Sequence, residues 1–155
     1  MIKIDLSEIM DLGKSFKDLS DDVLSGDLKQ GAYIAGSRIQ SKARDLVPVD
    51  TGALRISIEN SVGAQTRDIG VEVGPTQPYG KDIEFGRPPG TFVSAAALSG
   101  WAKRKGLNPY AVSWAIHKKG SPAQPFLFPA ANDQEENVVN ILAQAVINAF
   151  NNVLK

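Results

Sequence analysis

Residues 27–47 read DLKQGAYIAGSRIQSKARDLV, and the spacing of their apolar side chains predicts a helix. Asp27 is a residue type that caps helix N-termini, and Pro48 ends the helix because it drives the residue before it out of the helical region. One apolar stripe recurs at three- and four-residue intervals: Leu28, Ala32, Ala35, Ile39, Ala43 and Leu46. Half of this stripe is alanine, so we expect another element to pack close against it.

Two more long helices are predicted, one on each side in the sequence. The first covers residues 5–24 of an N-terminal helical region 1–26, and Ser25 and Gly26 separate it from the helix over 27–47. The last helix is expected over residues 130–153. Its apolar face comprises Val138, Ile141, Leu142, Ala145, Val146, Ala149, Phe150 and Val153.

Residues 53–86 change to a two-residue period and are predicted to form a β-sheet region. Leu54, Ile56 and Ile58 alternate with polar residues, which favours a strand with one buried face. Residues 69–74 alternate in the same way, and residues 66–68 suit a hairpin connection between the two strands. A third, shorter strand is expected over residues 79–85.

Residues 87–120 are expected to form an insertion, in which a proline-rich loop precedes short helices over 94–105 and 109–119. The helix boundaries are marked by Gly106, Pro109 and Gly120. The whole pattern predicts one α+β domain over residues 1–155. In it, a small antiparallel β-sheet packs against long N- and C-terminal helices and carries the loop and short-helix insertion.

The composition excludes several kinds of site. The 155 residues contain no cysteine and one histidine, which removes thiol catalysis, thiolate zinc sites and multi-histidine metal sites. The apolar stretch from Ile141 to Phe150 is broken by Gln144 and Asn148 and falls far short of the roughly 20 residues of a spanning helix. We therefore expect no membrane partner, no metal and no cofactor.

The 17 basic and 17 acidic residues cancel, but they are unevenly placed. Residues 1–27 hold seven acids and three lysines, whereas residues 85–132 hold no acid and six bases: Arg87, Lys103, Arg104, Lys105, Lys118 and Lys119. Two solvated faces would give this pattern, and so would head-to-tail complementarity between copies of the chain. Because Trp101 and Trp114 lie among the bases, a nucleic-acid contact is a third interpretation.

Candidate catalytic groups are sparse. Gly74 to Asp82 has the composition of a phosphate loop, but five residues separate Gly74 from Gly80 and Asp82 replaces the required Ser or Thr. Asp82 and Glu84 would share one face of a strand, and an exposed edge or salt-bridged interface is favoured over a cation or acid–base site. His117 is close to a predicted helix end, which favours a surface or capping role.

Three motifs follow one another along the chain. The first contains Pro48, Asp50, Thr51, Gly52, Leu54, Arg55 and Ser57, the second Tyr79, Glu84, Phe85 and Gly86, and the third Pro125, Phe126, Leu127, Pro129 and Ala130. In this order, between an alanine-rich helix and a long C-terminal helix, they resemble the tail-completion family of long-tailed bacteriophages. Members are also called head–tail joining or neck proteins and are often labelled minor tail components.

The resemblance implies a non-enzymatic virion protein with no catalytic residue. Such a subunit would form a ring of six copies at the siphophage neck, around the DNA path, after assembly in the bacterial cytoplasm. Its partners would be copies of itself, the head connector and the tail-tube or tail-terminator protein, with non-specific contact to packaged DNA. The six bases of residues 85–132 are candidates for the subunit interface or the DNA path. The alternative function is a small non-specific nucleic-acid-binding module that uses residues 101–119.

Overall fold

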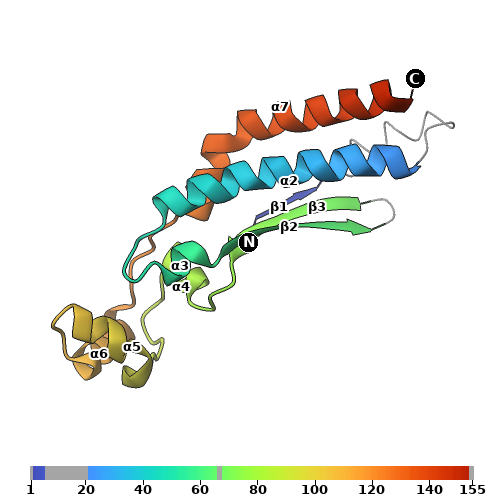
Figure 1. The fold of residues 1–155 in the computed structure, drawn as a ribbon. Helices are drawn as coiled ribbons and strands as arrows, with labels where there is room; N and C mark the ends of the chain where they lie inside the picture. Colours follow the sequence, from blue (N-terminus) through green and yellow to red (C-terminus); the bar gives the residue numbers. More distant parts are fainter. Residues whose placement is uncertain (1, 6–20, 66–67, 154–155) are drawn as a thin grey trace.

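The computed structural model describes residues 2–5, 21–65 and 68–153. Its elements, in chain order, are β1 (Ile2–Asp5), α2 (Asp21–Leu46), α3 (Ala53–Ile56), β2 (Ile58–Gln65), β3 (Asp68–Pro75), α4 (Gly80–Phe85), α5 (Ala95–Arg104), α6 (Pro109–Lys119) and α7 (Leu127–Val153) (Figure 1). The predicted α+β class is confirmed, with a small antiparallel sheet, long helices α2 and α7, and a short-helix insertion.

The sheet has the strand order β1-β3-β2, and both pairs are antiparallel. Val71 is central, opposite Val62 on one side and Ile4 on the other. Alternate residues of β3 face the helices, so Ile69, Val71 and Val73 are each about 1% exposed. The two-residue period predicted over residues 69–74 is confirmed.

Helix α2 packs on the sheet, and α7 packs along α2 (Figure 1). The alanines of the predicted stripe are fully buried, and Gly31 allows so close an approach that a Cβ there would overlap that of Ala145 on α7. The expectation that another element packs close against α2 is confirmed. Gln40 and Arg44 each donate a 2.7 Å hydrogen bond to the Ile58 carbonyl and so fasten α2 to the first residue of β2.

The N-terminal prediction needs two corrections. Residues 2–5 form strand β1 rather than helix, because the central strand β3 offers them its open edge. Helix α2 begins at Asp21 and continues through Ser25 and Gly26, where a break was expected. A single glycine inside a long helix costs only about 1 kcal/mol, which the packing of α2 offsets. Residues 6–20 of the predicted first helix lie outside the described residues.

Two strands predicted in the region 53–86 are also wrong. Residues 53–56 form the helical turn α3, and β2 begins only at Ile58. Residues 80–85 form helix α4, where Ile83 N–H donates to the Tyr79 carbonyl at 3.2 Å. A short apolar pattern fits one helical turn as well as a strand, so its period alone does not separate the two. Helices α5 and α6 confirm the two short helices expected in the insertion.

Candidate functional site

The second and third sequence motifs meet through one buried carboxylate. Glu84, on α4, is 4% exposed and accepts three backbone hydrogen bonds. Its Oε2 accepts from Phe126 N at 2.8 Å and Leu127 N at 2.9 Å, and its Oε1 accepts from Phe128 N at 3.0 Å. Glu84 thus caps the N-terminus of α7 from 42 to 44 residues away and places a negative charge where the helix dipole favours one.

This cap explains why α7 begins at Leu127, whereas the sequence predicted residue 130. No local residue signals the earlier start, since the cap comes from α4. Phe126 is fully buried, and Leu127 and Ala130 also belong to the core. The extended segment before α7 is therefore anchored by its side chains as well as by its amide groups.

The connections around this cap are held by backbone pairing. Arg87 and Ser121 exchange two hydrogen bonds, of 3.0 and 2.9 Å, and Gln124 N–H donates to the Ile83 carbonyl at 2.8 Å. Gly86 has φ +71°, and a Cβ there would lie 2.5 Å from the Ser121 carbonyl oxygen. Glycine is therefore required at this position by both the backbone angle and the lack of space.

The first motif connects to the insertion by an ion pair. Arg104, on α5, binds both oxygens of Asp50, with its Nε 3.0 Å from Oδ2. This hydrogen bond holds the pKa of Asp50 below its usual 3.8 and raises the pKa of Arg104. The local side-chain hydrogen bond of this motif is made by Thr51, whose Oγ1 accepts from Ala53 N at 3.4 Å.

The remaining motif residues divide by burial. Leu54 and Ser57 are buried, and Ser57 donates from its hydroxyl to the Leu54 carbonyl at 2.8 Å. Tyr79 and Phe85 of the second motif, and Phe128 within the stretch of the third, are exposed, at 39%, 75% and 65%. Arg55 lies 3.7 Å from Asp45 in an exposed pair, and Pro48 and Pro129 are half-buried. The motif thus contains structural anchors together with exposed apolar groups.

The six candidate basic residues do not form one equivalent set. Arg87 is largely buried and pairs with Asp82 at 2.6 Å, and Arg104 pairs with Asp50. Lys103, Lys105, Lys118 and Lys119 are exposed, and the Nζ of Lys118 lies 5.0 Å from the centre of the Trp114 ring. Arg87 and Arg104 are therefore held in place by ion pairs, whereas the four lysines present their charges on the surface.

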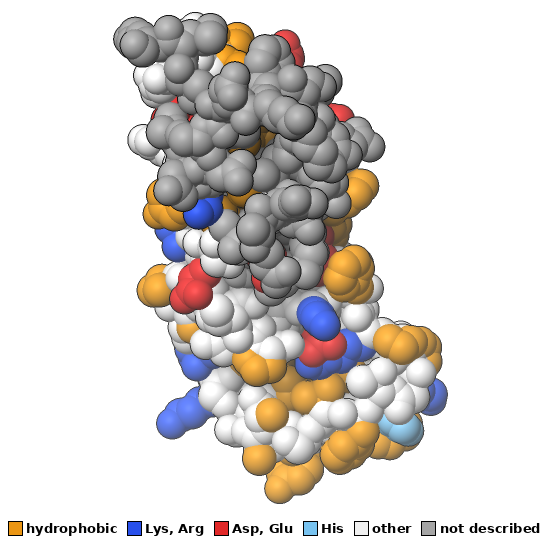
Figure 2. All heavy atoms as spheres, turned by 90° about the vertical axis from the view of Figure 1, so that its right-hand side faces the viewer, with side chains coloured by type: hydrophobic (Ala, Val, Ile, Leu, Met, Phe, Trp, Pro, Cys, Tyr) orange, Lys and Arg blue, Asp and Glu red, His pale blue; other side chains and the backbone are white. Residues whose placement is uncertain are grey.

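Helices α5 and α6 stand apart from the sheet and the long helices (Figure 1), and we call residues 88–119 the α5–α6 lobe. Its large apolar side chains are unusually open: Phe92 and Tyr110 are both 76% exposed and Trp114 is 64% exposed. Figure 2 shows hydrophobic and cationic side chains gathered at this lower end of the molecule. Such a concentration of aromatic surface is typical of a protein-binding region.

No catalytic constellation forms among the described residues. Asp82 and Glu84 were expected to share a strand face, but they lie on helix α4, where one pairs with Arg87 and the other caps α7. His117 is exposed in the last turn of α6, as predicted. Within the described ranges, no three acidic or histidine side chains are grouped to hold a metal ion.

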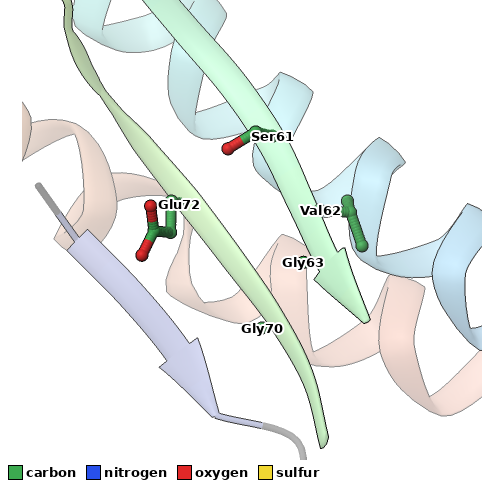
Figure 3. Close-up of a pocket in the computed structure, with 5 residues that line it drawn as sticks. All are labelled: Ser61, Val62, Gly63, Gly70 and Glu72. Carbon is green, nitrogen blue, oxygen red and sulfur yellow. The ribbon is translucent and has the colours of Figure 1, made fainter. Parts of the chain in front are cut away.

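One hollow, of about 410 Å³, lies on the β2–β3 pair (Figure 3). It is lined by Ser61, Val62, Gly63, Gly70 and Glu72, residues that the sequence did not single out. It brings together one carboxylate and two glycines, which is not a catalytic or metal-binding set. None of the helices in the described part of the chain combines the length and hydropathy needed to cross a membrane.

Comparison with known protein families identifies a match over the N-terminal part of the chain. Residues 10–86 match the profile of the HK97-gp10-like family, described as "Bacteriophage HK97-gp10, putative tail-component". This range covers the alanine-rich helix α2, strands β2 and β3, and α4 with its capping carboxylate. Searches of curated proteins and of solved structures gave no match.

Proposed function

We propose that this chain is a member of the HK97-gp10-like family of bacteriophage tail components, whose profile matches residues 10–86, and that it is a non-enzymatic structural protein of the virion. The family match is the observation that carries the proposal. The motif residues are consistent with it, since the groups that a catalyst would use are engaged in holding the fold. Glu84 caps a helix, and Asp50 and Asp82 are paired with arginines.

Our finer proposal places the protein at the neck, as a ring of six copies that joins the head connector to the tail tube or tail terminator around the DNA path. A closed ring of identical subunits needs two different surfaces that fit each other. The exposed aromatic and basic α5–α6 lobe supports this proposal, because it offers one such surface. Assembly would take place in the bacterial cytoplasm.

A second candidate function is non-specific contact with nucleic acid. The observation that favours it is the charge of the α5–α6 lobe, which contains five bases and no acid. A lumen that carries DNA would favour such a lining. In that case affinity for duplex DNA should fall steeply with added salt and with neutralisation of Lys103 and Lys105.

Light scattering across a wide concentration range, with negative-stain imaging, tests the ring. We expect closed rings and a steep rise in mass, either for the purified protein or after addition of the connector and tail-tube proteins of the same phage. A chain that stays monomeric with and without these partners would contradict the neck proposal. Salt-sensitive DNA binding by such a monomer would support the second candidate instead.

A further inference from the structure

The outward face of α6 has the character of a contact surface. Tyr110, Trp114 and Lys118 are spaced four residues apart, so they lie along one side of the helix. All three are exposed, and Lys118 lies over the Trp114 ring. The buried side of α6 is elsewhere, where Ser113 donates from its hydroxyl to the Val93 carbonyl at 2.5 Å. The largest side chains of this helix therefore face away from its own fold.

Helix α7 carries a matching outward stripe. Glu135, Val139 and Ala143 have the same four-residue spacing and are all exposed, with Val139 at 59%. Residues 127–153 contain three acids, Asp133, Glu135 and Glu136, and no base. The α5–α6 lobe has the opposite composition. The two helices therefore differ in sign, and each exposes apolar groups beside its charges.

We propose that the α6 face of one copy docks on the α7 stripe of a second copy, with the helices antiparallel. This inference rests on the proposed function, since it supplies the subunit contact that a ring needs. In this register Lys118 lies against Glu135, Trp114 against Val139, and Tyr110 against the small side chain of Ala143. Equal spacing of the two stripes lets all three pairs form together.

Two reasons indicate that the partner of the α6 face is a second copy of the chain. Figure 1 shows α6 well apart from α7, so the α6 face of a chain does not pack on the α7 helix of the same chain. The contact joins two different surfaces, and it therefore propagates from copy to copy as ring closure requires. Duplex DNA would match the lysines but would leave the rings of Tyr110 and Trp114 without an apolar partner.

Two variants that block opposite surfaces test the proposal. Trp114→Asp destroys the α6 face and leaves α7 intact, whereas Val139→Asp destroys the α7 stripe and leaves α6 intact. Under the conditions in which the wild-type chain assembles, we expect each variant alone to associate about 30-fold more weakly, the loss typical of a central aromatic contact. An equimolar mixture should form dimers of one copy of each, and nothing larger, as measured by light scattering.

The outcomes separate this inference from the proposed function. If Trp114→Asp assembles like the wild type, or if the mixture forms no dimers, the interface is wrong although the ring stands. If the wild type fails to assemble even with its partners, the ring itself is contradicted. If Trp114→Asp weakens binding of duplex DNA and leaves assembly unchanged, the α6 face contacts DNA. Lys29→Glu, on the exposed surface of α2, is the matched control and should assemble normally.

Discussion

Three backbone amides at the start of α7 depend on the single side chain of Glu84. We predict that Glu84→Gln lowers the free energy of unfolding by about 1–3 kcal/mol, because the amide has one accepting oxygen where the carboxylate has two, and no charge. Urea unfolding followed by circular dichroism measures the loss. Glu59→Gln is the control, because it makes the same substitution at an exposed position on β2. It should change the free energy of unfolding by less than about 0.5 kcal/mol. Equal losses in the two variants would show that the cap contributes nothing.

Asp50 should make the fold sensitive to acid. Its pKa is lowered in the folded state, chiefly by the hydrogen bond from Arg104, so the unfolded chain binds more protons as the pH falls below about 4. The stabilisation is therefore present above that pH and is lost as the pH falls through the folded-state pKa. We call the fall in the free energy of unfolding at low pH the acid arm. We expect Asp50→Asn to make this fall smaller, as measured by urea unfolding between neutral pH and strong acid.

Arg104→Gln should reduce the loss of stability at low pH in the same way. The double variant, with both substitutions, should reduce it no further than either single variant. The pair of Lys42 with Asp133, 3.0 Å apart, lowers the pKa of Asp133 and leaves a second acid-sensitive contribution in every variant. An acid arm that Asp50→Asn leaves unchanged would mean that the Asp50–Arg104 pair does not persist in solution.

At the scale of elements, the end of α6 needs glycine. Gly120 has φ +75°, and a Cβ there would overlap the Arg87 carbonyl oxygen. We predict that Gly120→Ala costs about 3 kcal/mol or more, from the backbone angle and the overlap together. Gly106→Ala is the matched control, because its φ is +66° but no atom lies within 4 Å. It should cost only about 1–2 kcal/mol in urea unfolding, and a similar loss at both sites would exclude the overlap.

The elements also show where reasoning from sequence succeeds. The alanine stripe of α2, the buried face of β3, and helices α5 and α6 were predicted correctly because each has a clear period or a local boundary residue. Asn108 and Pro109 mark the start of α6 by themselves, since the Asn108 side chain accepts from Tyr110 N at 2.9 Å. Local signals of this kind need no knowledge of the rest of the fold.

The predictions that failed concern features that are set by contacts between distant parts of the chain. The start of α7 is set by Glu84, and strand β1 exists because β3 has an open edge. The sequence motifs also gave no sign of the distant partners that their residues bind. Asp50, in the first motif, binds Arg104, 54 residues away. Of the six candidate bases, only the structure separates the paired Arg87 and Arg104 from the exposed lysines.

At the scale of the molecule, the α5–α6 lobe should be removable. Arg87 and Ser121 are paired across its base, so an Asn-Gly turn in place of residues 88–120 would close a two-residue hairpin. We expect the shortened chain to keep its sheet and long helices, seen as a cooperative unfolding transition by circular dichroism. It should no longer associate with copies of itself. A shortened chain that is unfolded would show that the lobe is part of the core.

The single-domain prediction has a direct test, because both tryptophans of the chain lie in the lobe. Tryptophan fluorescence therefore reports on the lobe, and far-ultraviolet circular dichroism mainly on the long helices. One domain predicts that the two thermal unfolding curves coincide. A fluorescence transition at a lower temperature would mean that the lobe unfolds as a separate unit.

The distance between Glu84 and the helix that it caps has a consequence for biosynthesis. The ribosome releases α2 and Glu84 well before α7. Helix α7 then covers the alanine stripe of α2 and supplies the amide groups that hydrogen-bond to the Glu84 carboxylate. Until α7 emerges, the nascent chain exposes the core residues that α7 would cover to chaperones and proteases. A premature stop before residue 127 would make this state permanent, and such a truncated product would be degraded or aggregate instead of entering a particle.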